Sequence, residues 1–164
     1  MAWQRNWPAR NNSLPDYTFL QLAWATDSAA ISSVRRQVFV IEQGICEQEE
    51  WDSADATAVH VLGLNKKRDA VGTGRVERSG RVGRVAVLSA YRGQGIGTGL
   101  LHELVRTARS YGVERAYLNA QVQAACFYEA LGFAPIGAPF IEAGIAHIRM
   151  ELQLEPDANA ERQS

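Results

Sequence analysis

The sequence predicts an α+β domain built on a mixed, mostly antiparallel sheet of about seven strands flanked by helices. Its 164 residues fit one domain. Three strand-like segments follow one another with short turns between them, which favours antiparallel pairing because parallel pairing needs long crossovers. Amphipathic helical patterns precede and follow these three strands. The expected order is β-α-β-β-β-α-β-α-β-β.

Composition narrows the class of protein. The chain carries 17 Lys and Arg against 18 Asp and Glu, a net charge of −1, which argues against a nucleic-acid partner. It shows neither an apolar run long enough to span a membrane nor the apolar core of a signal peptide, so we expect a cytoplasmic protein without a membrane partner. Cys46 and Cys126 have no metal-ligand spacing, and no metal is expected; Cys126 is expected to be a small buried residue.

The first half begins with an expected N-terminal arm over residues 1–16, which lacks apolar periodicity. An aromatic-rich strand is predicted over 17–24. Asp27 or Ser28 then supplies an N-cap for a helix that ends near Gly44. The apolar face of this helix is expected to comprise Ile31, Val34, Val38 and Ile41.

The second half alternates strands and helices. Polar turns separate three strands, predicted over 58–64, 70–77 and 81–88. Next come a helix from Ile96 stopped at Gly112, a short strand, a helix stopped at Gly132 and a final alternating strand over 145–154. Residues 135–144 are interpreted as a loop that closes over a site or contributes to a homodimer. The domain is expected over 17–154, with a polar tail over 155–164.

Residues 85–100 form the most informative stretch, in which a strand enters a loop with glycines at four alternate positions and a helix follows at once. Glycines allow positive φ and close approach of a ligand, and a helix N-terminus attracts anions. The spacing excludes the dinucleotide motif G-x-G-x-x-G and the Walker motif G-x-x-x-x-G-K-[ST]. It does fit [QR]-x-x-G-x-[GA] from Arg92 to Gly97.

This stretch resembles the pyrophosphate loop of the GNAT superfamily of N-acetyltransferases, which bind acetyl-CoA. A second stretch, 121–133, is similar to that family's N-x-x-A-x-x-[LF]-Y-x-x-x-G-F, with Gln121 in place of Asn. Residues 39–44, the acidic run after them and 144–150 resemble the ElaA-type branch, and the final strand resembles that of glyphosate N-acetyltransferases. The resemblance covers about residues 17–154.

The resemblance implies a GNAT-like fold whose sheet splays open to admit acetyl-CoA. The amides of 94–99 would hold its phosphates, assisted by Arg92 and Thr98, and the strand backbone at Val87 would pair with its pantetheine arm. The residues implied in binding acetyl-CoA are Val85, Val87, Arg92, Gly93, Gln94, Gly95, Ile96, Gly97, Thr98, Gly99, Gln121 and Phe127.

The resemblance also implies catalytic residues. Tyr128 would protonate the departing thiolate, although an aromatic residue on an apolar helix face is also typical of core packing. His147 would accept a proton from the attacking amine, although a single histidine in a strand is often structural. The expected reaction is direct acetyl transfer to the primary amine of a small molecule in a ternary complex. A protein acceptor and a non-catalytic acyl-CoA-binding module are the alternatives.

The acceptor site is the least patterned part of the sequence. Residues 42–55 carry six carboxylates and no Lys or Arg. Such a run is typical of a solvated surface, and the alternative is an acceptor mouth that attracts an ammonium group. The candidates for contact with the acceptor are Glu42, His60, Arg75 and Arg84.

Overall fold

The computed structural model describes residues 14–155. Most of the expected arm and of the expected tail therefore lies outside the described residues. The elements in chain order are β1 Tyr17–Ala23, α1 Trp24–Arg35, π-helix η2 Arg36–Glu42, α2 Glu47–Glu50, 3-10 helix η3 Ser53–Ala56, β2 Val59–Asn65, β3 Ala70–Val76, β4 Val82–Val87, 3-10 helix η4 Ser89–Tyr91, α3 Ile96–Ser110, β5 Arg115–Gln121, 3-10 helix η5 Val122–Ala124, α4 Ala125–Ala130, β6 Ala134–Glu142 and β7 Ile145–Gln153.

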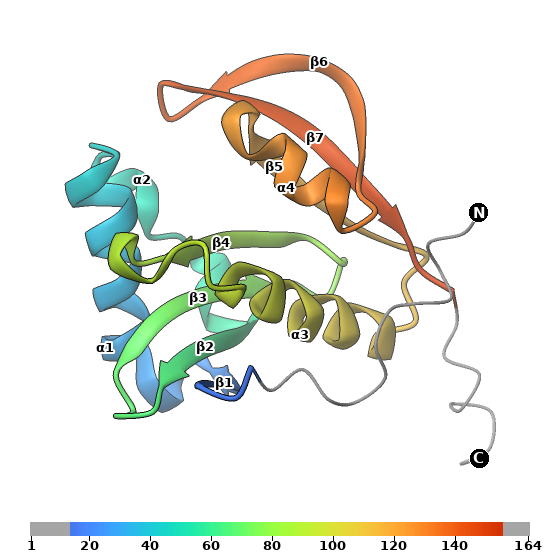
Figure 1. The fold of residues 1–164 in the computed structure, drawn as a ribbon. Coiled ribbons are helices and arrows are strands. Elements are labelled where there is room, and N and C mark those ends of the chain that lie inside the picture. The colour runs from blue at the N-terminus through green and yellow to red at the C-terminus, as the bar shows by residue number, and fades with distance from the viewer. Residues whose placement is uncertain (1–13, 156–164) are drawn as a thin grey trace, which may run out of the picture.

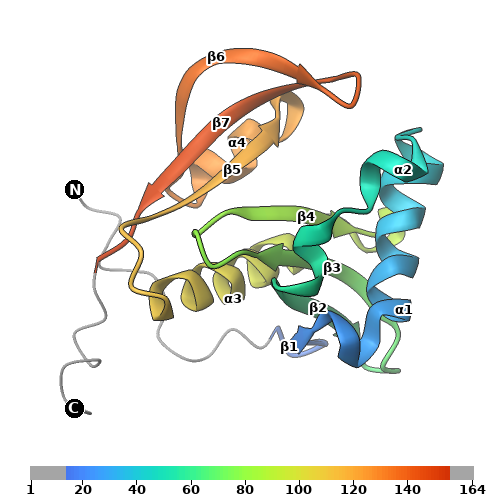
Figure 2. The ribbon, with the colours of Figure 1, turned by 180° about the vertical axis from the view of Figure 1, so that it is seen from behind.

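The strands form two antiparallel sheets, of order β1-β2-β3-β4 and β5-β7-β6. A parallel bridge between Arg81 and Tyr117 joins them, next to a hydrogen bond of 3.1 Å from the Tyr117 N–H to the Gly80 carbonyl. From this junction β4 and β5 separate toward the side that carries α2 (Figures 1 and 2). The expected mixed sheet that splays open is therefore confirmed.

Helices cover both faces of the four-stranded sheet. Strand β2 shows this by its alternation, because Val61 packs in one cluster with Leu100 of α3 while Leu62 packs in another with Ile31 of α1. On α3, the side chains of Leu100 and Leu104, one turn apart, are both fully buried. The glycine loop is thus held between a strand and a helix that both belong to the core.

The first helix starts earlier than predicted, because α1 opens at Trp24 and kinks at Asp27, whose φ and ψ are non-helical. The Asp27 Oδ1 accepts the Ala30 N–H at 3.2 Å, so the predicted cap lies at this kink. The helix then continues into η2, whose wider π turns were not expected. Val38 and Phe39 pack against Ala86 of β4, whereas Ile41, expected on the buried face, is 61% exposed. The extra residue per turn rotates Ile41 out of the face that a regular helix would bury.

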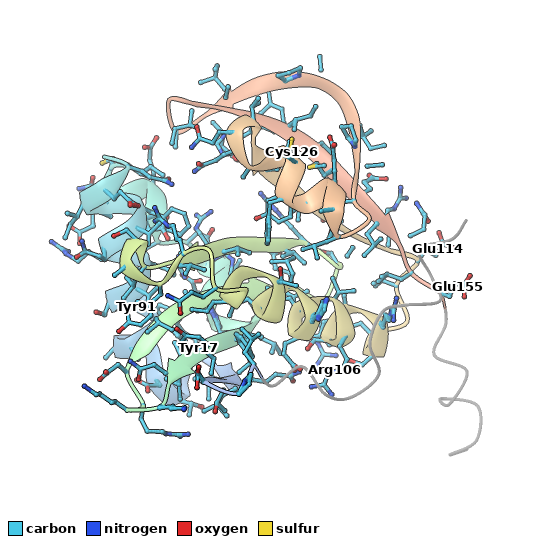
Figure 3. All side chains as sticks on the ribbon, in the orientation of Figure 1. Tyr17, Tyr91, Arg106, Glu114, Cys126 and Glu155 are labelled. Carbon is cyan, nitrogen blue, oxygen red and sulfur yellow. The ribbon has the colours of Figure 1, made fainter. Side chains whose placement is uncertain are left out.

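Two further expectations are wrong. Residues 135–144 form most of β6 rather than a loop. Strand β6 lies at the edge of its sheet, and an edge strand tolerates the missing N–H groups of Pro135 and Pro139. Cys126, labelled on α4 in Figure 3, is exposed instead of being buried. Among the described residues, no helix is both long and apolar enough to cross a membrane.

Candidate active site

A cleft of about 880 Å³ lies where the two sheets separate. One end is bordered by β4, the loop of residues 88–95, the start of α3 and helix α4. The other end is bordered by η2, α2, the end of β5 and the turn between β6 and β7. The cleft therefore joins the glycine loop to segments that come before and after it in the sequence.

The backbone of the glycine loop is shaped to bind an anion. Gly93 and Gly95 have φ of +76° and +85°, and Gly95 is the N-cap of α3. The first bond of the helix runs from the Gly99 N–H to the Gly95 carbonyl at 3.0 Å, which leaves the preceding N–H groups, including those of Ile96 and Thr98, without helical partners. This cradle fits the phosphates of an acyl-CoA substrate.

The later glycines of the loop have packing roles. A Cβ on Gly99 would lie 2.3 Å from Cζ of Phe19, and the Gly99 N–H is used within the helix. Gly99 is therefore required for packing and does not offer its amide to phosphate, contrary to our expectation. A Cβ on Gly97 would lie 3.1 Å from Cζ of Phe127, so Gly97 lets α4 approach the loop. Gly97 and Phe127 both line the cleft.

Two polar side chains of the glycine loop are engaged elsewhere, and one of them, Arg92, was expected to assist phosphate binding. Arg92 forms an ion pair of 2.5 Å with Glu42 and donates from Nε to the Val87 carbonyl at 3.0 Å. This hydrogen bond lowers the pKa of Glu42, which is not among the residues that line the cleft. Gln94 is exposed, and its Oε1 accepts the Tyr17 hydroxyl; Figure 3 shows Tyr17 below this loop.

A β-bulge in β4 directs backbone groups into the cleft. Thr73 pairs with Ala86 and Arg75 with Gly83, so Arg84 and Val85 together face one residue of β3. The bulge gives Arg84 a φ of +51°.

Beyond the bulge, the Leu88 N–H bonds to the Val71 carbonyl at 2.9 Å. By the alternation of an antiparallel pair, the backbone groups of Val87 then point away from β3. The Val87 carbonyl receives Arg92, and its N–H faces the side on which the sheets separate. Val85 and Val87 both line the cleft.

Gln121 joins the two halves of the molecule across the cleft. Its Nε2 donates to Oε1 of Gln43 at 2.8 Å, and the Gln43 amide returns a bond of 3.4 Å. We call this pair the glutamine clasp. Gln43 was not selected from the sequence as a site residue, and the only signal for it was its place in the segment 39–44.

Tyr128 reaches the cleft from α4. Its ring meets Phe127 and Phe133 edge to face, with centroids 5.0 and 6.0 Å apart. Burial raises the pKa of Tyr128 to about 12. The phenol therefore stays protonated throughout the neutral range and can donate to a leaving group.

His147 reaches the cleft from β7 with one ring nitrogen held by the backbone. Its Nδ1 lies 2.7 Å from the Ile145 carbonyl, which only accepts, so Nδ1 carries the proton. In the neutral ring, Nε2 then holds the lone pair. Nε2 lies 3.8 Å from Oε2 of Glu142, a cleft residue that was not selected from the sequence. Phe140 stacks on the imidazole with centroids 6.0 Å apart.

Half of the six carboxylates in the acidic run belong to an ion network, which we define as Arg35, Glu50, Asp52, Asp55, Arg75 and Arg84. Arg35 is fully buried and lies 2.7 Å from both Glu50 and Asp55. Desolvation raises the pKa of Glu50, whereas hydrogen bonds from Arg75 lower that of Asp52 to about 2. Neither interpretation of the run, a solvated face or an acceptor mouth, describes the buried Glu50 and Asp55, whereas Glu42, Glu47 and Glu49 are exposed as on a solvated face.

The remaining candidates for contact with the acceptor, His60, Arg75 and Arg84, differ in whether they reach the cleft. His60 is buried, its Nε2 donates to the Asp55 carbonyl at 2.9 Å, and it is not among the residues that line the cleft. The expected contact between His60 and the acceptor is therefore wrong. Arg75 reaches the cleft, but Asp52 and Asp55 hold its guanidinium. Arg84 lines the cleft with 26% of its side chain exposed. No group of three or more His, Cys, Asp or Glu within residues 14–155 is placed to hold a metal ion.

Comparisons with known proteins agree with this geometry. The family model of the GNAT acetyltransferase domain matches residues 28–154. Escherichia coli ElaA is 33% identical over 130 residues, which are 74% of this chain and 84% of ElaA. The ElaA crystal structure superposes with a TM-score of 0.74 at 28% identity, covering 83% of this chain and 99% of that one.

A second solved structure, an acyl-CoA N-acyltransferase from Pseudomonas aeruginosa, has a TM-score of 0.73 at 26% identity and covers 83% of this chain and 99% of that one. The family match spans strands β2 to β7 and the residues that line the cleft, with the glycine loop and Tyr128 within it. The chain therefore belongs to the GNAT family of acetyltransferases, whose members use an acyl-CoA as co-substrate.

Proposed function

We propose that this protein transfers the acetyl group of acetyl-CoA to the primary amine of a small molecule, directly and in a ternary complex. The observation that carries the proposal is that one cleft brings together an anion cradle at the glycine loop, a protonated phenol at Tyr128 and the bare Nε2 of His147. A cradle alone would serve an acyl-CoA-binding module. The added acid and base favour catalysis.

The proposed reaction assigns one role to each group. His147 Nε2 takes a proton from the ammonium form of the acceptor, and the nitrogen lone pair then attacks the thioester carbon. The C–N bond forms as the C–S bond breaks, and Tyr128 donates its proton to the CoA thiolate. The second proton lost by the nitrogen replaces the one given by Tyr128. One proton in total leaves to solvent.

The cleft supports a small acceptor. The turn between β6 and β7 lies on the same side of the molecule as α2 in both views, so the acceptor end has a wall on each side (Figures 1 and 2). Glu49 of α2 and Glu142 next to the turn both line it. A compact amine fits between these walls more readily than a folded protein does.

The first test is the melting temperature with saturating acetyl-CoA. A ligand at about a hundred times its dissociation constant stabilises by about 2.7 kcal/mol, which corresponds to a rise of about 5–10 °C for a chain of this size. Release of free CoA is then followed with a panel of small primary amines. The absence of any shift with acetyl-CoA would overturn the proposal.

Two substitutions test the chemistry. Tyr128→Phe and His147→Gln are each expected to lower kcat by about 10²- to 10⁴-fold with the best amine, while acetyl-CoA still raises the melting temperature. His102→Gln, on α3 outside the cleft lining, is the matched histidine control and should keep wild-type kcat. Full turnover by both site variants would show that other groups move the protons.

A further inference from the structure

The turn between β6 and β7 builds a carboxylate–imidazole pair through its register. Ala143 and Gly144 both have positive φ, of +50° and +74°, as a tight two-residue hairpin requires. Glu142 pairs with Ile145, and Phe140 pairs with His147. Glu142 and His147 are therefore diagonal neighbours on one face of the sheet, and the hairpin sets their separation.

The carboxylate of Glu142 differs from that of Glu50, a buried carboxylate that also lines the cleft. Glu50 is 2% exposed and is held by Arg35 and Arg84. The Glu142 side chain is 47% exposed, lines the cleft, and makes its ion contact with His147 Nε2, the nitrogen that carries the lone pair. Its charge is thus presented to the cleft at the proposed base.

The distance between the two groups leaves room for a donor. Glu142 Oε2 and His147 Nε2 are 3.8 Å apart, which is too long for a direct hydrogen bond. Both atoms accept hydrogen bonds when the imidazole is neutral. An ammonium nitrogen about 2.8 Å from each atom would satisfy both, because an ammonium group carries several donors.

We propose that Glu142 binds the ammonium group of the acceptor and places it against His147 Nε2, so that this site selects amines that are positively charged in solution. The inference rests on the proposed acetyl transfer. Glu142 contributes twice: it attracts the charged acceptor, and it then stabilises the imidazolium formed when one ammonium proton moves to Nε2. Release of that proton to water follows along the exposed carboxylate.

Few charged side chains other than Glu142 surround the His147 ring. Arg149 follows on the same face of β7, Gln121 is the uncharged partner on β5, and Tyr128 lies on α4. Arg84 and Glu49 line the same cleft from β4 and α2. Within residues 14–155, the charged side chain that makes an ion contact with the His147 ring is that of Glu142.

The experiment compares two acceptor probes in the full chain. Ethanolamine is a cation at neutral pH, whereas methoxyamine is uncharged and needs no ammonium anchor. Glu142→Gln removes the charge and keeps the shape of a side chain that is half exposed. It should lower kcat/KM for ethanolamine about ten- to a hundredfold and change that for methoxyamine less than threefold. Glu129→Gln, exposed on α4 outside the cleft lining, removes the same charge and should leave both rates at wild type.

A double variant separates a role at His147 from a general structural one. In a His147→Gln background, Glu142→Gln should add less than threefold to the loss of kcat/KM for ethanolamine. Equal losses for the two probes would overturn the anchor. If the wild type transfers to no amine of the panel, charged or uncharged, the proposed function itself is overturned, and the anchor with it.

Discussion

The two ends of the cleft present different chemical groups, namely backbone N–H groups at one end and side chains at the other. At the cofactor end, the anion cradle consists of backbone N–H groups from one continuous segment, residues 93–98, shaped by glycines with positive φ. At the acceptor end, the groups that matter are side chains of α2, β4, β5 and the β6–β7 hairpin. Beneath them lies an ion network in which residues in direct contact are up to 34 positions apart in the sequence.

This difference explains why one end was recognised from the sequence and the other was not. A backbone cradle needs particular residue types at fixed local spacing, so it leaves a motif. A side-chain site needs only that distant positions meet, and many spacings satisfy that condition. The comparison predicts that substitutions at the acceptor end will act through ion pairing, and those at the cofactor end through backbone geometry and packing.

The largest expected effect is on the ion network. Arg35→Met leaves the buried Glu50 and Asp55 without their shared cation, and breaking such a pair costs about 3–5 kcal/mol. The melting temperature should fall by about 6–20 °C. Arg36→Ala is the neighbouring control, because its ion pair with Glu47 has side chains 53% and 45% exposed and should contribute within about 1 kcal/mol. A fall of similar size in both variants would show that the burial of the network is not what stabilises it.

The next effect separates packing from ligand binding within the glycine loop. Gly99→Ala places a Cβ against the Phe19 ring and should cost about 1–3 kcal/mol, measured by urea unfolding, with little change in acetyl-CoA affinity. Gly93→Ala meets no atom within 4 Å but is strained at φ +76°, at about 1 kcal/mol. It should weaken acetyl-CoA binding more than Gly99→Ala does. The reverse order in a calorimetric titration would return Gly99 to the cofactor site.

A third effect concerns acid. Hydrogen bonds from Arg75 depress the pKa of Asp52 from 3.8 to about 2 in the folded chain. The unfolded state therefore binds the proton first, so this carboxylate contributes stability above pH 4 that is lost as pH falls toward 2. Because its side chain is 39% exposed, we expect only about 1 kcal/mol. Asp52→Asn should be less stable than wild type at pH 6, and the difference should shrink steadily toward pH 2; a constant difference would contradict the linkage.

The smallest expected effect is at the glutamine clasp, which spans both ends. Gln43→Ala removes a partly exposed amide pair worth about 1 kcal/mol and frees the Gln121 amide for the pantetheine arm, so acetyl-CoA should bind up to about fivefold more tightly. Gln121→Ala should weaken binding by a similar factor. Equal changes of the same sign would show that Gln121 acts only through the clasp.

Part of the fold was predictable because it depends on local rules. The Asp27 cap, the stops at Gly44 and Gly112, the three-strand meander and the strand–glycine loop–helix unit all follow from which residues tolerate which φ and ψ. The π-helix η2 and strand β6 were not predictable in this way. The conformation of η2 depends on the packing of its side chains against Ala86. Strand β6 forms by pairing with β7, although its prolines disfavour a strand.

The sequence by itself determined the family, the anion cradle and the identity of the acid and base candidates, because each leaves a short pattern of residue types. Only the tertiary structure decided their surroundings. It paired Arg92 with Glu42, 50 residues away, and Gln43 with Gln121, 78 residues away. It also set Glu142 beside His147, since their separation depends on a strand that its own prolines argue against. The physical reason is that side-chain contacts are specified by the path of the folded backbone, and no local spacing encodes that path.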